Sequence, residues 1–303
     1  MQNHFRNILV ATDFSQSCKD AIDTAITLCK KHQAVLHLLH VVENRYILAE
    51  DNMEVSTEAI RNEIDQASRS QLYNLYELII RNHGISVQIH MPTGIPYDEI
   101  CKTATEVPID LIVTGTHGLS GSRDFFIGTT TYNVIKNAIK PVLIIPDGLG
   151  TMNFKRVLFP VRPGQQIFAK YELVEAFLKN DPAVFQIAVF RTDEKELSGP
   201  YSHELGKMIN SMIGKGISCA KEIYTCPDFA AKVLEISSSF SADLVAINAS
   251  LEYKWSQFFL GAYTQKIVNH SKVPVLCYRS AVDIASTLIE TREKMSTAGF
   301  KLN

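Results

Sequence analysis

The chain has 303 residues, of which 46% are hydrophobic and 20% charged, values typical of a globular protein with about two sizeable domains. No apolar run reaches the roughly 18 residues of a membrane span, and a net charge of −2 gives no basic footprint for nucleic acid. The N-terminus has no signal-peptide pattern and the six cysteines are scattered within apolar patterns, so we expect a cytoplasmic protein with reduced thiols.

The first half of the chain alternates predicted strands and helices. Residues 7–12 read NILVAT, an apolar run typical of a strand buried on both faces. Ser15 can cap the next helix, in which apolar residues recur at helical spacing from Cys18 to Cys29. The remaining elements are predicted as a strand at 34–42, a helix at 56–83, a strand at 85–90, a helix at 97–105, a strand at 110–114, a helix at 129–139 and a strand at 141–145.

The longest predicted helix, over residues 56–83, is rich in polar residues. One stripe of apolar residues should face the core. It consists of Ile60, Ile64, Ala67, Leu75, Leu78 and Ile79.

This alternation of buried strands and helices predicts a parallel sheet covered on both faces. Five such strands usually adopt a doubly wound, Rossmann-like order with one switch point. Ligands in this architecture bind beyond the carboxyl ends of the strands at that point. The fold class is therefore α/β.

An internal repeat follows a glycine-containing linker at residues 147–153. Residues 156–161 (RVLFPV) resemble the first strand, and residues 110–146 align with residues 243–279 without a gap. Identical pairs include Phe125/Phe258, Phe126/Phe259, Gly128/Gly261 and the two Pro-Val-Leu triplets. We therefore expect two doubly wound five-stranded domains in tandem, at 1–147 and 154–280, with a helical tail at 281–303.

The segment at residues 114–131, TGTHGLSGSRDFFIGTTT, leaves the fourth predicted strand and enters the next helix. Gly115, Gly118 and Gly128 would let the backbone approach a phosphate closely. Residues 129–131 would begin the helix, where amide groups and the helix dipole favour an anion and the threonine hydroxyls add donors. Such a loop suits a triphosphate.

The pattern Gly-x-x-Gly-x9-Gly-Thr resembles the ATP-binding signature of the universal stress protein family. The ATDFS run at 11–15, the HVV run at 40–42 and the PVLII run at 141–145 resemble that family too. The resemblance covers residues 4–146 and, more weakly, 154–280, so the whole chain is similar to tandem members. It implies a stress-response regulatory protein that binds ATP, with Mg²⁺ as counter-ion.

The resemblance also implies which residues contact the nucleotide. Residues 11–13 would line the adenosine pocket, and Val41 would meet the adenine. Thr114, Gly115, His117 and Gly118 would run under the ribose and phosphates, and residues 128–130 would hold the phosphates. The complete set is Ala11, Thr12, Asp13, Val41, Thr114, Gly115, His117, Gly118, Gly128, Thr129 and Thr130. No catalytic residue and no metal ligand is assigned.

Plainer interpretations of the same residues stay open. Asp13 could serve merely as the cap of the first helix, and Val41 could be merely a core residue. His117 could be an exposed loop residue without a role in binding. The glycines could serve turns alone. His37 and His40 fit a strand pattern better than a metal site, because no third ligand lies nearby in the sequence.

The second copy lacks the signature. Asn248, Leu251 and Ala262 stand at the positions of Gly115, Gly118 and Thr129, and Arg162 stands near the position of Asp13. This degenerate copy is expected to be a structural partner. The strands at 141–145 and 274–278 would otherwise be exposed edges, so we expect them to pair antiparallel as an intramolecular pseudo-dimer. A homodimer of the whole chain stays open.

Three functions remain at this point. The first is an ATP-binding regulatory protein with an unknown protein partner, in which turnover would be slow because no residue is seen to position an attacking water. The second is a slow Mg²⁺-dependent ATPase or nucleotidyl-transfer enzyme. The third is an interaction scaffold whose pocket holds another ligand or none.

Overall fold

The computed structural model describes residues 5–43, 54–116, 127–150, 153–162, 166–179, 181–191, 200–254 and 257–279. The first half contains β1 (Asn7–Ala11), the 3-10 turn η1 (Gln16–Cys18), α1 (Lys19–His32), β2 (Val35–Leu39), β3 (Val42–Glu43), α2 (Glu54–His83), β4 (Val87–His90), β5 (Thr93–Gly94), α3 (Pro96–Glu106), β6 (Leu111–Gly115), α4 (Thr129–Asn137) and β7 (Val142–Ile145). These elements follow the predicted order of strands and helices.

The second half repeats the alternation. It contains β8 (Arg156–Val161), α5 (Ile167–Leu178), β9 (Val184–Arg191), α6 (Pro200–Gly214), β10 (Cys219–Thr225), α7 (Phe229–Ser239), β11 (Leu244–Asn248), β12 (Leu251–Lys254), β13 (Gln257–Leu260), α8 (Ala262–His270) and β14 (Val275–Tyr278). The predicted tail at 281–303 lies outside the described residues. None of the helices in the described ranges is long and apolar enough to cross a membrane.

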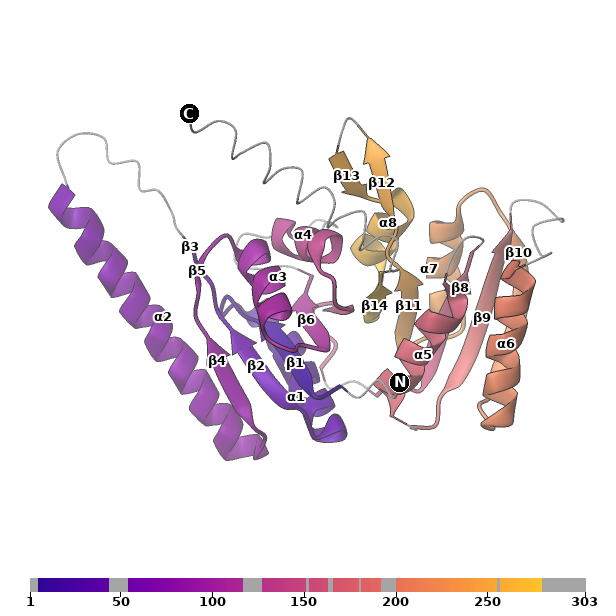
Figure 1. Cartoon of the computed structure of the whole chain (residues 1–303), viewed down its shortest axis with the longest axis horizontal. Helices are drawn as coiled ribbons and strands as arrows, with labels where there is room; N and C mark the ends of the chain where they lie inside the picture. The colour runs from indigo at the N-terminus through magenta and orange to yellow at the C-terminus, as the bar shows by residue number, and fades with distance from the viewer. Residues whose placement is uncertain are drawn as a thin grey trace.

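The two halves share one ten-stranded sheet in the order β10-β9-β8-β11-β14-β7-β6-β1-β2-β4 (Figure 1). Within each half, the strands appear in the order third, second, first, fourth, fifth, which is the doubly wound arrangement that the sequence predicts. Neighbouring strands within a half are parallel, whereas β14 pairs antiparallel with β7, Val275 lying opposite Ile144 and Cys277 opposite Val142. The expected pairing of the two last strands is confirmed.

Helices cover the sheet on both faces, and each face has its own apolar core. In β1, Ile8 and Val10 point into the core under α1, α2, α5 and α6, while Leu9 points into the core under α3, α4, α7 and α8. This alternation is the period-two geometry of a strand buried on both faces. Each core runs through both halves of the chain.

The predicted apolar stripe of α2 is partly wrong. Ile79 is buried and Leu75 packs against the core as predicted, but Ile64, Ala67 and Leu78 are exposed. Leu72, which was not predicted, is buried. The side chain of Ile60 lies outside the described residues. The helix flanks the edge strand β4 (Figure 1), so only a narrow stripe has a sheet to pack against.

The linker is tied to the first half by one carboxylate. Asp20 Oδ2 in α1 accepts hydrogen bonds from the amides of Gly148, at 2.6 Å, and Leu149, at 3.2 Å. Gly148 and Gly150 have φ values of 79° and 64°, which glycine adopts without strain. These hydrogen bonds therefore hold the start of the linker against α1.

Candidate functional site

The switch point of the first half lies between β1 and β6. These neighbours are parallel, with Val10 opposite Val113. The chain leaves β1 toward α1 on one face and leaves β6 toward α4 on the other, and ligands of doubly wound proteins bind in the crevice that such a switch point can form. The predicted residues 11–13 and 114–115 therefore lie at the same edge of the sheet.

The segment after β1 is held by its own side chains. Thr12 Oγ1 accepts a hydrogen bond from the Phe14 amide at 3.0 Å, and Asp13 Oδ1 accepts from the Ser15 amide at 3.0 Å. The Cys18 thiol also donates to Asp13 Oδ1 at 3.0 Å, and burial raises the pKa of that thiol to about 11, so it keeps its proton. Asp13 therefore does cap the turn that begins the helical segment.

The expected cap of the first helix by Ser15 is wrong in detail. Ser15 precedes η1 rather than α1, and its side chain makes no capping hydrogen bond. Its hydroxyl lies 2.7 Å from that of Ser17. Asp13 closes a local turn ahead of η1, because its carboxylate accepts from the amide two residues later.

His40 and Val41 follow β2 beside this segment. His40 Nδ1 lies within hydrogen-bond distance of the Thr12 carbonyl oxygen, at 2.9 Å, and its ring centroid is 4.4 Å from that of Phe14. The Val41 side chain is 9% exposed and belongs to the core under α3 and α4. The interpretation of His40 as a structural residue agrees with this contact, and Val41 lies mainly in the core.

The loop between β6 and α4 is closed at its neck. The Gly128 amide donates to the Thr116 carbonyl at 2.8 Å, and the Thr131 hydroxyl donates to the Gly115 carbonyl at 2.8 Å. The hydroxyls of Thr114 and Thr131 are 3.3 Å apart. These contacts fix the start of α4 against the end of β6. The Thr131 hydroxyl is used in a hydrogen bond within the protein and is not directed at a ligand.

The first turn of α4 begins beside the end of β6 without a capping side chain. Gly128 is the N-cap residue, with φ −59° and ψ 151°, and no acidic residue occupies the first turn. Thr129 is exposed and Thr130 is half-buried. Because amides in a first turn have no partner within their helix, this end suits an anion.

The structure therefore brings most of the predicted residues to one place. Ala11, Thr12, Asp13, Thr114, Gly115, Gly128, Thr129 and Thr130 lie at the carboxyl ends of β1 and β6 or at the start of α4. His117 and Gly118 lie outside the described residues. Thr116 and Thr131 were not predicted as contacts, although the threonine run at 129–131 offered a signal.

The equivalent place in the second half has different chemistry. The Gly261 amide donates to the Ser250 carbonyl at 2.8 Å, so the neck of this loop is closed as well. The Arg162 guanidinium, however, lies 3.8 Å from the ring centroid of Tyr263, the second residue of α8. A cationic side chain therefore packs against the ring of a residue in the first turn of this helix.

Asn248 ends β11 where Gly115 ends β6. It is 5% exposed, and within the described part of the chain neither its amide nitrogen nor its amide oxygen has a hydrogen-bond partner. The side chain of Leu251 lies outside the described residues, but its backbone begins the antiparallel pair β12–β13. The loop of the second half thus contains a short antiparallel pair of strands.

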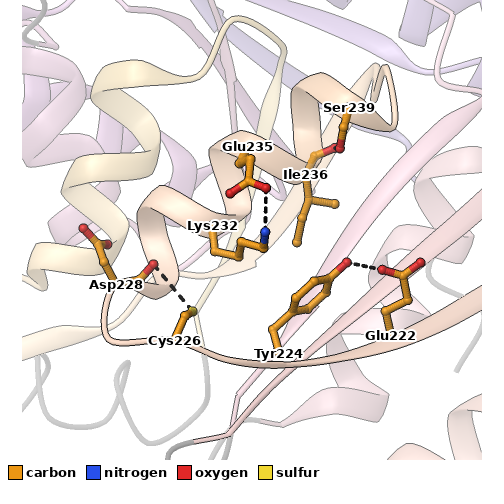
Figure 2. Close-up of polar contacts among 8 residues, drawn as sticks. All are labelled: Glu222, Tyr224, Cys226, Asp228, Lys232, Glu235, Ile236 and Ser239. Atoms are coloured by element: carbon orange, nitrogen blue, oxygen red, sulfur yellow. Dashed lines mark hydrogen bonds and ion pairs between the residues drawn. The ribbon is translucent and has the colours of Figure 1, made fainter.

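A second polar cluster lies between β10 and α7 (Figure 2). The Tyr224 hydroxyl donates to Glu222, and Lys232 pairs with Glu235 at 2.5 Å. The Cys226 thiol points to the Asp228 carbonyl at 3.8 Å, and burial raises the pKa of this thiol. In Figure 2 these polar groups contact one another. The cluster is therefore accounted for by the start of α7 and by an ion pair at the surface.

Comparisons with known proteins agree with this geometry. The model of the universal stress protein family matches residues 4–146. A universal stress protein of Methanocaldococcus jannaschii is 30% identical over 155 residues, which cover 46% of this chain and 94% of that protein. Universal stress protein YxiE of Bacillus subtilis is 31% identical over 147 residues, which cover 46% of this chain and 99% of that protein.

A solved structure extends the comparison to both halves. The crystal structure of a universal stress protein from Archaeoglobus fulgidus has a TM-score of 0.71 at 18% identity, covering 92% of this chain and 99% of that one. The fold thus defines a doubly wound α/β protein of two similar halves. The chain belongs to the universal stress protein family.

Proposed function

We propose that this protein is a regulatory member of its family that binds one ATP, with Mg²⁺, at the switch point between β1 and β6. In this proposal residues 1–147 form the nucleotide-binding domain and residues 154–280 form its structural partner. The family resemblance of the 114–131 signature supports ATP as the ligand.

The observation that carries the proposal is the closed neck of the β6–α4 loop. The 2.8 Å hydrogen bond from the Gly128 amide to the Thr116 carbonyl holds the uncapped first turn of α4 near the end of β6, the strand that pairs with β1. Adenosine would lie against the end of β1, and the phosphates would reach the amides of Thr129 and Thr130. Backbone amides suit a phosphate because they need no charged side chain.

Mg²⁺ fits this site only when it is bound together with the phosphates of the nucleotide. Within the described ranges, no group of three His, Cys, Asp or Glu side chains could hold a metal ion. Mg²⁺ commonly keeps several waters and is held by substrate phosphates with one or two carboxylates. Asp13 is the carboxylate at this crevice, but its Oδ1 already accepts two hydrogen bonds, which favours shaping the pocket over activating a water.

The second half is proposed to hold no nucleotide. Asn248 adds a side chain where the first half has Gly115, and Arg162 packs on Tyr263 near the position that Asp13 has in the first half. The added side chain of Asn248 would obstruct a backbone phosphate cradle. The expected stoichiometry is therefore one nucleotide per chain.

Isothermal titration of ligand-free protein with MgATP tests the proposal. We expect one site per chain, abolished in Gly118→Leu, where a branched side chain enters the glycine signature. The matched change in the second half, Leu251→Gly, should neither add a site nor weaken the first. Two equivalent sites, or binding that survives Gly118→Leu, would contradict the proposal. Mass spectrometry of ligand co-purified with the native chain identifies the physiological nucleotide.

A further inference from the structure

Groups of the second half form hydrogen bonds with the chain before, within and after α4. The Ile127 amide donates to Asn269 Oδ1 of α8 at 3.1 Å. Tyr132 Oη accepts a hydrogen bond from the Leu260 amide at 3.2 Å. Arg279 Nη1 donates to the carbonyls of Lys136, at 2.9 Å, and Ala138, at 3.0 Å. Both α4 and α8 (Figure 1) pack into the core that also contains Val142 and Ile144 of β7 and Val275 and Cys277 of β14.

Arg279 holds the carboxyl end of α4. Its side chain is 4% exposed, so its charge acts where water screens it little. The two carbonyls that it contacts belong to the last turn of the helix, where a cation interacts favourably with the helix dipole. The helix is therefore restrained at the end far from the proposed phosphate site.

Asn269 acts at the other end, immediately before the proposed phosphate contacts. It binds the Ile127 amide, while the next amide, that of Gly128, is bound by Thr116 of the first half. Two consecutive amides are thus held by opposite halves of the chain. The next residues, Thr129 and Thr130, are those whose amides are proposed to bind phosphate.

The arrangement is reciprocal but not symmetric. In the repeat alignment Leu260 corresponds to Ile127, and each of these amides binds a side chain of the other half. The acceptors differ, because Lys136 stands at the position of Asn269 and Gln265 at that of Tyr132. An asparagine acceptor is therefore directed specifically at the loop of the half proposed to bind nucleotide.

We infer that Asn269 is a positioning residue through which the second half sets the phosphate-binding amides of the first. This inference rests on the proposed function. Losing the acceptor should let residues 127–130 adopt several backbone positions, so binding must first reorder them. The loss of affinity should concern the phosphates and not the adenosine. The hydrogen bonds described for residues 11–13 are all made within the first half and none of them involves α8.

The test compares Asn269→Ala, Asn269→Asp and Tyr132→Phe with the unaltered chain. Titration with MgATP and, separately, with adenosine measures affinity, and amide hydrogen exchange at Ile127 measures order. Asn269→Ala should weaken MgATP about three- to tenfold, change adenosine affinity less than about twofold, and speed exchange at Ile127. Asn269→Asp keeps an acceptor oxygen and should retain slow exchange.

Tyr132→Phe is the matched control, because it removes a cross-half hydrogen bond of similar length that serves the second half's loop. It should leave MgATP affinity unchanged. If both variants lost MgATP affinity to the same extent, the inference would be overturned and the proposed function would stand. The same holds if the unaltered chain binds MgATP and Asn269→Ala binds it with unchanged affinity. An unaltered chain that binds no nucleotide overturns the proposed function together with the inference.

Discussion

Asp110 and Asp243 perform the same task in the two halves. Asp110 Oδ2 accepts hydrogen bonds from the amides of Arg6, at 2.7 Å, and Asn7, at 3.0 Å. Asp243 accepts from the amides of Lys155 and Arg156, both at 2.8 Å. Each carboxylate, placed just before the fourth strand of its half, thereby fixes the beginning of the first strand.

Asp243→Ala should destabilise the protein, because it leaves two backbone amides without charged acceptors. We expect the free energy of unfolding to fall by about 2–4 kcal/mol. Urea unfolding followed by circular dichroism measures it. Glu235→Ala, which breaks only the surface pair with Lys232, is the control and should cost at most about 1 kcal/mol. Equal effects of the two changes would contradict this account of Asp243.

A negative charge at the start of α4 should separate nucleotide binding from stability. Thr129→Glu places a carboxylate in the first turn, which favours the helix by about 0.3–1 kcal/mol but repels a triphosphate. We expect MgATP affinity to fall at least about tenfold with no loss of thermal stability. The matched change, Ala262→Glu, enters the equivalent first position of α8.

Titration and differential scanning fluorimetry measure both quantities in the Thr129→Glu and Ala262→Glu variants. Ala262→Glu should leave MgATP affinity unchanged. If Ala262→Glu weakened MgATP as much as Thr129→Glu does, the assignment of the site to the first half would be wrong.

Asn248→Val should stabilise the second half. The amide of Asn248 is buried and its atoms have no hydrogen-bond partner within the described residues, which costs folding free energy. Valine removes both polar atoms and suits the end of a strand, so we expect a gain of about 1 kcal/mol. Asn248→Asp would bury a charge and should be clearly destabilising. A less stable valine variant would show that the amide is satisfied by a water or a ligand.

Low pH should reduce the stability of the first half through protonation of His37. His37 Nδ1 lies 2.9 Å from His90 Nε2, and its Nε2 lies 3.1 Å from Asn7 Oδ1. The side chain is 1% exposed. Burial, with the neighbouring His90 as a second cause, lowers the pKa of His37 to about 4, while Asp110 acts in the opposite direction. Burial also lowers the pKa of His90.

Because the folded pKa of His37 lies below the unfolded value of about 6.5, the unfolded chain binds the proton first as pH falls. Stability should be complete above pH about 6.5 and should decrease between about 6.5 and 4. His37→Gln should reduce this slope by about one proton. Some slope should remain, since burial also lowers the pKa of His32 to about 4. Urea unfolding at a series of pH values measures the slope, and an unchanged slope would refute the role of His37.

The strand order could be predicted because parallel strands buried on both faces appear in the sequence as uninterrupted apolar runs, as in residues 7–12. The crevice could be predicted because glycines mark its loop. The stripe of α2 was predicted less well, since a helix at the sheet edge buries only the residues nearest β4, and edge position depends on topology.

The contacts of Asn269 and Arg279 could not be predicted, because they join residues more than a hundred positions apart through the packing of two helices. Asp110 and Asp243 were visible as an identical pair in the repeat. Their shared role appears only when the start of the first strand is placed beside them. Sequence periodicity describes single elements, whereas these side chains act between elements.

Because β7 and β14 belong to one chain, the two sides of their junction can acquire different substitutions. Two identical chains joined through this strand would carry every substitution twice, once on each side of the junction. Here each side is encoded separately, so Asn269 can face Ile127 while Lys136 occupies the corresponding position opposite. Because the partners are covalently joined, dilution cannot separate them, and a contact that would be too weak to hold two chains together can persist.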